Sequence, residues 1–487
     1  MTTSVNEAPP SHLINFGCGH PDASLLPLQE IATATQRALL GSAGDNNNNY
    51  SGQEWLQYGR ENGNLKARQA LADFLSTIYA TDTGTTSSGS SSSNMVDPDS
   101  LFLTSGVSHS IQLVCRTLKR LHCEKQPGNN TTSSLPKPLC LVEDPTYFLI
   151  PPLLQQSGFE LQAVPTDPAC GLNLTVLRER VQSMRDESPH RLIVLYCIPT
   201  HHNPLGVSLS NAARMELVDL CETHGVYLIA DEVYHGLGFP TTFDTEDSTA
   251  PRQQSAESPY PMAMIRNHKN DKASSSSSSP FVISVSAFTK ILCPGIRCGW
   301  IQSSDAQLMR ALCTDGVLDS GGCSSQLASG IVTQLIDSRV LHTYTKSLQQ
   351  EYAERCHHLC TLLQKASFND TFSFALEIPK GGYFVWVRVW GVDFRMDENF
   401  REYCRQHHNV DFRTGMSCSS ETWKTTLTAT RKQDESPKPD FSQYIRLCFA
   451  YYNVATLTLG VERLCQAIQA YALLSKEQQQ QQRPSAL

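Results

Sequence analysis

Long hydrophobic runs are missing from this chain of 487 residues. No apolar stretch approaches the roughly 20 residues that a transmembrane helix needs, so we expect no membrane partner. Basic charge is also scarce: the net charge is −8 and no basic patch is interleaved with aromatic residues, which argues against nucleic acid as a partner. The N-terminus shows neither the basic nor the apolar segment of a signal peptide. What remains is a composition of 40% hydrophobic and 18% charged residues, typical of a soluble globular chain with a large core.

Paired cysteine motifs are absent as well. The chain has 17 cysteines, an odd number, and they stand mostly in apolar contexts such as those of Cys197 and Cys448. This pattern predicts reduced, buried thiols and a cytoplasmic or otherwise reducing location. Cys356 and Cys360 enclose two histidines, but they lie in a long helical stretch, and we expect no metal there.

Four polar segments interrupt the chain, near residues 81–94, 124–136, 241–279 and 419–438. They are rich in serine, threonine and asparagine, and we expect them to be insertions too polar to join a core. Residues 476–487 form a glutamine-rich tail of low complexity.

Short apolar strands alternate with helical patterns in the rest of the chain. We expect strands at 101–103, 139–143, 192–198, 226–231 and 281–286, with helices that include 108–121 and 211–223. This alternation predicts an α/β fold with a large, mostly parallel sheet covered on both faces. A long helix from about residue 341 leads into a smaller α+β domain. We therefore expect a large domain at 51–340 and a small domain at 341–475, completed by residues 1–50.

A single lysine, Lys290, follows the strand expected at 281–286, and Arg297 comes seven positions later beyond a Pro-Gly turn. A lysine in a sheltered site can hold an aldehyde cofactor as a Schiff base when burial or nearby cations lower its pKa. Arg297 would then bind a phosphate group. Taken alone, this stretch fits a surface lysine and a surface arginine equally well.

Other candidate residues stand at the carboxyl ends of expected strands, where open parallel sheets bind ligands. Gly106, Val107 and Ser108 begin a helix whose N-terminus suits a phosphate, although Ser108 is also an ordinary helix cap. Tyr147 follows a proline at the end of the next strand, where it can stack on a flat ring or pack in the core.

The later strands end in polar side chains. Asn203 precedes a proline, which keeps it out of the helical region at the strand end. Asp231 ends an apolar strand, and a carboxylate buried there needs a cation such as a protonated pyridine nitrogen. Tyr234 stands three positions later and can hydrogen-bond a phenolate oxygen. Arg446 lies inside an apolar strand, where it would bind a substrate carboxylate or form a structural ion pair.

Together these residues resemble fold-type I pyridoxal-phosphate enzymes of aminotransferase class I and II, which have an aspartate aminotransferase-like fold. The resemblance covers nearly the whole ordered chain, and its order and spacing are specific. The stretches YCIPTHHNPLG, DSGGCSSQL, KGGYFVW and LQYGRENG are similar to the aminoadipate/aromatic aminotransferase branch, and within it to fungal 2-aminoadipate transaminase-like proteins.

The resemblance implies pyridoxal 5'-phosphate as cofactor and a role for each matched residue. Lys290, Asp231 and Tyr234 would be catalytic and would also bind the cofactor. The other implied cofactor contacts are Gly106, Val107, Ser108, Thr289 and Arg297, with Tyr147 on the ring face, Asn203 at the ring oxygen, and Tyr58 reaching in from the partner subunit of a homodimer. Arg446, Asn203 and Gly19 would bind the substrate.

Two positions depart from the family pattern. Ala287 stands where the family usually has a phosphate-binding serine, a loss that Thr289 or Ser286 could offset. Val107 replaces another common serine.

These expectations lead to a transaminase that moves an α-amino group to a 2-oxo acid such as 2-oxoglutarate. The amino donor stays open among aminoadipate, aromatic, leucine-like and kynurenine-like substrates. One alternative is a β-eliminating C–S lyase with the same residues. Another is a non-catalytic sensor like the aminotransferase-like part of some bacterial regulators, although this acidic chain enters its domain without room for a DNA-binding region ahead of it.

Overall fold

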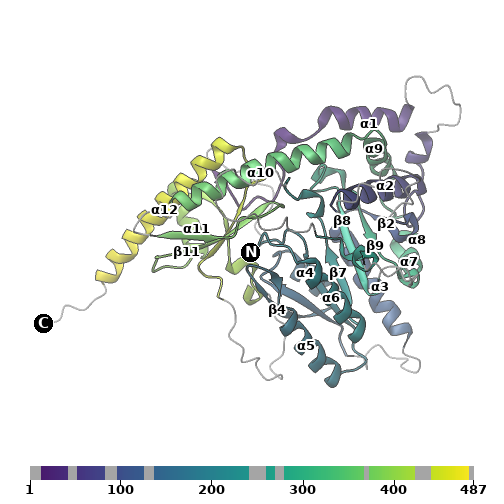
Figure 1. Ribbon diagram of the computed structural model, residues 1–487, viewed down its shortest axis with the longest axis horizontal. Coiled ribbons are helices and arrows are strands. Elements are labelled where there is room, and N and C mark those ends of the chain that lie inside the picture. Colours follow the sequence, from purple (N-terminus) through teal and green to yellow (C-terminus); the bar gives the residue numbers. More distant parts are fainter. Residues whose placement is uncertain are drawn as a thin grey trace.

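An eight-stranded sheet forms the centre of the computed structural model (Figure 1). The structure describes residues 13–41, 52–82, 96–125, 136–240, 259–268, 279–366, 372–422 and 440–481. The strands, in the order β2-β9-β8-β7-β6-β3-β4-β5, are β2 (Leu101–Thr104), β9 (Gly299–Gln302), β8 (Val282–Ala287), β7 (Tyr227–Asp231), β6 (Ile193–Cys197), β3 (Leu139–Asp144), β4 (Glu160–Asp167) and β5 (Gly171–Leu172). The five strands from β8 to β4 are parallel, whereas β9 and β5 run antiparallel to their neighbours. The predicted α/β class with a mostly parallel sheet is confirmed.

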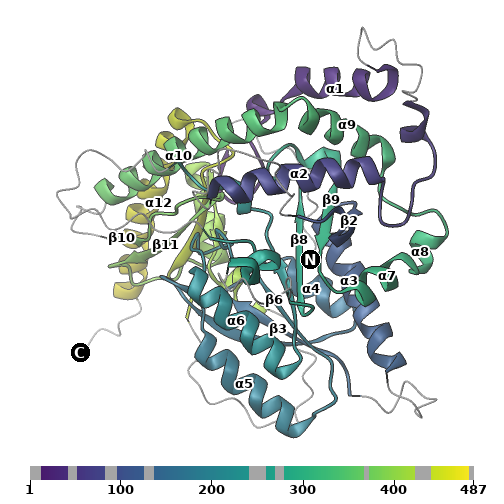
Figure 2. The same ribbon diagram turned by 45° about the vertical axis from the view of Figure 1, so that its right-hand side comes forward.

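Both faces of this sheet are buried, as Figures 1 and 2 show by the helices on its two sides. Leu139 and Leu141 of β3 belong to one apolar cluster, and Cys140 and Val142 between them belong to another. Because successive side chains of a strand point to opposite faces, the strands read as continuous apolar runs. The covering helices are α2 (Leu65–Asp82), α3 (Val107–Glu124), α4 (Ile150–Gln156), α5 (Leu174–Glu187), α6 (Asn211–His224), α7 (Ala306–Cys313), α8 (Gly316–Asp319) and α9 (Gln326–Asp337).

A second, antiparallel sheet lies to one side, with α10 (Val340–Ala366), α11 (Glu398–His408) and α12 (Val454–Gln481) nearby (Figure 1). Its strand order is β10 (Ser373–Leu376), β11 (Phe384–Trp390), β14 (Tyr444–Cys448) and β13 (Arg413–Thr414). The N-terminal strand β1 (Ile14–Asn15) pairs with β12 (Val410–Asp411), and α1 (Leu28–Leu40) contacts α9. The N-terminal segment therefore connects this region with the large sheet.

Parts of the predicted polar insertions are ordered, which corrects the expectation from composition. The 3-10 helix η6 (Met262–His268) lies inside the segment 241–279, and its Met262 and Ile265 are buried in the core. Four consecutive apolar residues drive this packing, although polar stretches flank them. Ser420, inside the segment 419–438, donates a backbone hydrogen bond of 2.9 Å to Asp144. Residues 83–94, 126–135, 241–258, 269–278 and 423–438 of the predicted insertions lie outside the described residues.

Helix α12 continues to Gln481, so the predicted low-complexity tail begins as helix. Residues 482–487 lie outside the described part of the chain.

The carboxyl ends of the parallel strands face the small sheet. Asp144 at the end of β3 bonds to Ser420, and Asn203 beyond β6 bonds to Arg446 of β14. Tyr383, just before β11, donates a hydrogen bond of 3.0 Å to the carbonyl of Lys290, which follows β8. Groups from both sheets therefore meet at this edge.

Candidate active site

Lys290 lies in the turn after β8, with its amine directed at the N-terminal segment. Its Nζ donates a hydrogen bond of 2.6 Å to the carbonyl of Gly19 and lies 5.0 Å from the ring centroid of Tyr383 and 5.9 Å from that of Tyr234. The pKa of Lys290 is lowered to about 8, mainly by burial and also by Arg446, while Cys448 and Asp231 act in the opposite direction. At pH 7 about a tenth of this amine is therefore neutral and nucleophilic, far more than for an ordinary lysine.

Asp231 ends β7 as a buried carboxylate that is 5% exposed. It accepts a hydrogen bond of 2.7 Å from the hydroxyl of Tyr196 and a longer one of 3.4 Å from the backbone of Val233. Burial raises its pKa to about 6, although Tyr196, Val233 and Lys290 act in the opposite direction. Such a carboxylate is costly to ionise unless a cation comes beside it.

Tyr234 follows Asp231 and is 3% exposed. Its ring centroid lies 5.5 Å from that of Tyr383 and 5.9 Å from the Lys290 amine. Burial raises the pKa of Tyr234, and Arg446 opposes this, so the phenol stays protonated and can donate a hydrogen bond.

Arg446 is a cation in the centre of the small sheet, only 2% exposed. It donates hydrogen bonds of 2.9 Å to Asn203 Oδ1 and to the carbonyl of Gly17, and its guanidinium stands 4.0 Å from the ring centroid of Phe384. Its Nε is buried without a hydrogen-bond partner. No carboxylate of the described residues pairs with it, so the predicted structural ion pair is not formed there.

A cradle for an anion lies where α3 begins. Gly106 caps this helix with φ of 102°, and a Cβ added to it would come 2.6 Å from Arg297 Nη2. The guanidinium of Arg297 therefore closes over the N-terminus of α3, where the first backbone N–H groups have no partner in the helix. Val107 and Ser108 form the first turn, with Ser108 exposed.

Ser286 does not offset the departure at Ala287, which corrects one of our expectations. Its hydroxyl donates a hydrogen bond of 3.2 Å to the backbone oxygen of Glu232, and neighbouring strand residues point to opposite faces. Ala287 instead pairs with Gly299, whose added Cβ would meet Gly106 at 2.9 Å. Ala287 thus faces the Gly106 cradle and Ser286 faces away. Thr289 is half-buried in the turn before Lys290.

Tyr147 and Tyr58 differ sharply in their positions. Tyr147 is half-buried just after β3. Burial raises the pKa of its phenol, Arg446 lowers this pKa and Asp231 raises it, so the phenol lies near both charged groups. Tyr58 is 86% exposed and stands against Gly321.

Three further aromatic residues belong to this site and were not assigned a role from the sequence: Tyr196, Tyr383 and Phe384. Tyr196 holds Asp231, while Tyr383 and Phe384 form the wall beside Lys290 and Arg446. Tyr383 and Phe384 are part of the KGGYFVW stretch, which was the available signal. Tyr196 lies in an apolar strand, where an aromatic residue cannot be told from core packing.

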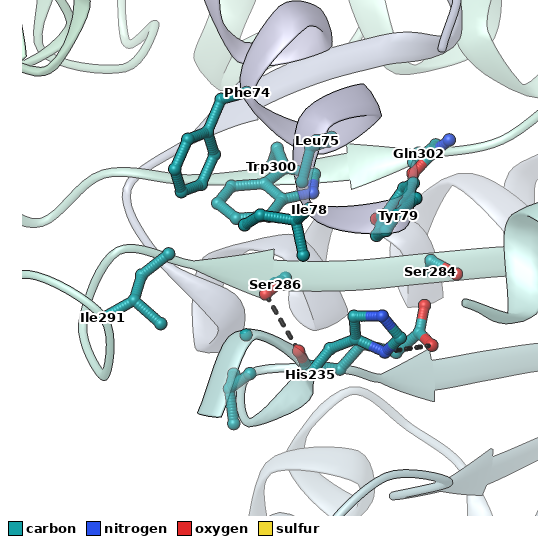
Figure 3. A pocket seen from close by; sticks show the side chains of 13 residues that line it. Phe74, Leu75, Ile78, Tyr79, His235, Ser284, Ser286, Ile291, Trp300 and Gln302 are labelled. Carbon is teal, nitrogen blue, oxygen red and sulfur yellow. Dashed lines mark hydrogen bonds and ion pairs between the residues drawn. The ribbon is translucent and has the colours of Figure 1, made fainter. Parts of the chain in front are cut away.

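An additional pocket lies between α2 and strands β8 and β9, on the face of the large sheet opposite to the Asp231 side chain (Figure 3). Figure 3 shows Phe74, Ile78 and Tyr79 of α2 around Trp300, with Ser284, Ser286 and His235 below them. Asp231 is paired with Val285, so it faces away from this pocket. None of the residues that line the pocket is lysine or arginine, and burial lowers the pKa of His235 to about 3. This pocket therefore does not suit a phosphate.

The site fits pyridoxal 5'-phosphate on three observations. Asp231 is a buried carboxylate suited to a protonated ring nitrogen, Lys290 is an amine of lowered pKa, and Gly106 with Arg297 forms a cradle suited to a phosphate.

Comparison with known proteins identifies the family. The sequence matches the family described as aminotransferase class I and II over residues 11–464. Because this match spans most of the chain, the chain belongs to that family. It is an enzyme that transfers amino groups, and its cofactor is pyridoxal 5'-phosphate.

Two relatives illustrate the range of similar sequences. The uncharacterized protein YER152C of Saccharomyces cerevisiae is 28% identical over 395 residues, 77% of this chain and 82% of that protein. The uncharacterized HTH-type transcriptional regulator YdfD of Bacillus subtilis is 23% identical over 377 residues, 77% of this chain and 62% of the regulator. The second relative is of the kind that the sensor hypothesis considered.

Solved structures show the same fold. The multiple substrate aminotransferase of Thermococcus profundus superposes with a TM-score of 0.69 at 19% identity, covering 95% of this chain and 92% of that one. LysN, the alpha-aminoadipate aminotransferase of Thermus thermophilus, superposes with a TM-score of 0.66 at 19% identity, covering 95% and 94%. Within the described residues, no helix combines the length and apolar character needed to cross a membrane.

Proposed function

We propose that this aminotransferase moves the α-amino group of an amino acid, of the 2-aminoadipate or the aromatic or aliphatic type, to a 2-oxo acid such as 2-oxoglutarate. The named activities of the two structural neighbours, a multiple substrate aminotransferase and an alpha-aminoadipate aminotransferase, support this range. We also propose that it works as a homodimer in the cytoplasm. Its 17 free cysteines support a reducing compartment.

One observation carries the proposal: Arg446 and Lys290 bond to carbonyls only two residues apart. Arg446 donates to Gly17 and Lys290 donates to Gly19. Two extended residues span at most about 7 Å, so the two acceptor carbonyls lie close together, and the effect of Arg446 in lowering the pKa of Lys290 also places the cation near the amine. An α-amino acid places a carboxylate and an amino group on one carbon, and this spacing suits both at once.

We assign the cofactor contacts as the resemblance implies. Lys290 would hold the aldehyde carbon, Asp231 the ring nitrogen, and Asn203 and Tyr234 the ring oxygen. Arg446 occupies Asn203 Oδ1, which leaves the amide donor of Asn203 for that oxygen. The remaining assignments are Tyr147 on the ring face, Gly106, Val107, Ser108, Thr289 and Arg297 around the phosphate, and Tyr58 of a second copy of the chain.

When bound, pyridoxal 5'-phosphate carries the amino group and withdraws electrons from the bonds at the substrate α-carbon. Asp231 holds the proton on the ring nitrogen that makes this withdrawal effective. Arg446 and Asn203 orient the α-carboxylate, and Lys290 Nζ takes the proton from the α-carbon and returns it. The rings of Tyr383 and Phe384 exclude water from that side.

We further propose that residues 51–340 form the cofactor domain and residues 341–475 the small domain, with residues 1–50 completing the latter. Pairing of β1 with β12 and the contacts of Gly17 and Gly19 support this division.

Replacement of Lys290 tests the proposal. We expect Lys290→Ala to lower the rate of 2-oxo product formation by at least about 10³-fold, because loss of a general base alone costs about 10²- to 10⁴-fold. Lys380→Ala is the matched control, since Lys380 is an exposed lysine in the same region and should leave the rate unchanged. Wild-type rates in Lys290→Ala would refute the proposal. Release of ammonia and pyruvate from a cysteine conjugate, with no 2-oxo acid added as acceptor, would indicate a lyase instead.

A further inference from the structure

Two arginines stand opposite each other in the small sheet. Arg413 of β13 is paired in register with Arg446 of β14, so their side chains share one face. Like charges in directly opposite positions destabilise a sheet. Burial lowers the pKa of Arg413, and Arg446 and Arg401 lower it further. The free protein therefore holds a charge arrangement that an anion would relieve.

Neither arginine has a carboxylate partner among the described residues. The nearby carboxylate of Asp411 pairs with Arg401 at 2.6 Å and with Arg405 at 3.9 Å. Arg446 donates only to the neutral oxygens of Asn203 and Gly17. The Nε atoms of both Arg413 and Arg446 are buried without a hydrogen-bond partner.

Arg413 belongs to the wall of the site. Its guanidinium lies 4.1 Å from the ring centroid of Phe148, and that of Arg446 lies 5.7 Å from the same ring. Burial raises the pKa values of Tyr147 and Cys18, and both arginines lower them. Cys18 lies between Gly17 and Gly19, the residues whose carbonyls accept from Arg446 and Lys290.

We propose that Arg413 is a second anion-binding residue of the substrate site, which binds the distal carboxylate of a dicarboxylic substrate while Arg446 binds its α-carboxylate. This inference rests on the proposed transamination and narrows it to amino acids with a carboxylate side chain and to dicarboxylic 2-oxo acids. A monocarboxylic substrate would leave one of the two cations without an anion.

Matched substrate pairs test the assignment in the holoenzyme. L-2-Aminoadipate and L-norleucine have side chains of equal length, and only the first ends in a carboxylate. L-Glutamate and L-norvaline form a second such pair. We expect wild-type kcat/KM to favour the acidic member of each pair. Arg413→Gln should lower kcat/KM for the acidic member on the order of 100-fold, as for loss of one partner of a buried charge pair. It should leave the neutral member within about threefold, since that substrate makes no charged contact there.

Arg388→Gln is the matched control. Arg388 lies on β11 in the same sheet, and its guanidinium stands over the rings of Trp390 and Tyr444 rather than over Phe148. It should leave both substrate preferences unchanged. Arg413→Lys keeps the charge without the two-pronged geometry and should give an intermediate preference, which also serves if Arg413→Gln does not fold.

The outcomes separate the two proposals. Selective loss of the acidic substrates in Arg413→Gln supports the role of Arg413. Equal loss for both members of a pair means that both arginines hold the α-carboxylate, and no loss means that Arg413 binds neither; each result overturns this inference and leaves transamination intact. Absence of transamination by the wild type with every donor overturns the proposed function instead.

A binding measurement without turnover tests the anion-binding role of Arg413 even if the wild type transaminates none of the donors. Glutarate and pentanoate differ only in the second carboxylate, and calorimetry on the holoenzyme gives both affinities. We expect the wild type to favour glutarate by at least about tenfold and Arg413→Gln to remove most of this preference. An unchanged ratio of affinities would overturn the inference independently of any reaction.

Discussion

At the scale of single residues, the Lys290 amine is set apart by its surroundings. Its hydrogen-bond acceptor is the carbonyl of Gly19, and aromatic rings stand beside it. Burial lowers its pKa to about 8, from an ordinary value of 10.5. Below pH 8 the protonated form predominates and cannot attack an aldehyde, and above pH 8 the neutral amine predominates.

The rate at which pyridoxal 5'-phosphate attaches to the cofactor-free protein should follow this titration. We expect it to rise about tenfold per pH unit below pH 8 and to level off above it, because only the neutral amine reacts. Visible absorbance after mixing measures the rate. The same reaction with Nα-acetyllysine, whose side-chain amine is free, corrects for ionisation of the cofactor. In Asp231→Asn the midpoint should fall, because the carboxylate of Asp231 raises the pKa of Lys290. A midpoint near 10.5 would show that the amine is fully hydrated.

Sequence reasoning identifies the polar members of this site but not the aromatic ones. Lys290, Asp231 and Arg446 are recognisable because a charge at the end of, or within, an apolar strand is unusual. Tyr196 and Tyr383 hydrogen-bond or flank these charges, yet aromatic residues in apolar stretches are ordinary core residues. Arg413 could not be paired with Arg446 before the strand register was known.

At the scale of elements, the start of α3 depends on one glycine. Gly106 has φ of 102°, and a Cβ there would approach Arg297 Nη2 to 2.6 Å. The end of a flexible side chain can move, so Gly106→Ala should displace Arg297 from the cradle. We expect affinity for pyridoxal 5'-phosphate to fall by about tenfold or more, as expected for loss of a charge-assisted contact, while affinity for pyridoxal, which has no phosphate, changes little.

Gly225→Ala provides the control for backbone strain. Gly225 also has positive φ, of 62°, but the nearest atom to an added Cβ is 3.8 Å away. This variant should lose about 1–2 kcal/mol of the free energy of unfolding and keep its cofactor affinity. Fluorescence titration with both cofactor forms and denaturant unfolding measure the two quantities. Equal loss of pyridoxal and pyridoxal 5'-phosphate in Gly106→Ala would contradict a phosphate cradle.

Composition predicts some of the elements of this fold and misses others. The five predicted strands are all present, with no end shifted by more than one residue, because strands buried on both faces are continuous apolar runs. Strand β9 was not predicted, since it begins with a glycine and follows closely on the Lys290 turn and its Pro-Gly pair, which read as one continuous loop. Helix η6 was missed because its few apolar residues stand within a long polar stretch.

At the scale of the whole molecule, exposed apolar residues lie on several elements, including the segment of Tyr58. Leu28 and Leu40 on α1, Leu56 on the 3-10 helix η2 (Gly52–Leu56) and Val317 on α8 are all more than half exposed, with Leu40 at 78%. Leu56 lies two residues before Tyr58, and Tyr58 stands against Gly321, which follows α8, so part of this exposed apolar surface adjoins Tyr58, as is typical of protein interfaces. Together with Tyr58 they support the proposed homodimer, in which each Tyr58 would complete the site of the other subunit.

Mixing two inactive variants tests this sharing of sites. In Lys290→Ala the catalytic amine is lost, and in Tyr58→Glu a carboxylate would repel the phosphate of the partner's cofactor. In a mixed dimer of these variants, one site carries both changes and the other carries neither. Equal mixing with free exchange makes half of the dimers mixed, so activity should recover to about a quarter of the wild-type value in a symmetric dimer. Mixing Lys290→Ala with Tyr234→Phe is the control for complementation, because both residues belong to one subunit's site and subunit exchange should then restore no site. Sedimentation should show dimers throughout.

Two outcomes would contradict this arrangement. No recovery despite exchanged dimers would mean that Tyr58 acts within its own subunit or has no part in the site. A monomer of full activity would refute the shared site altogether.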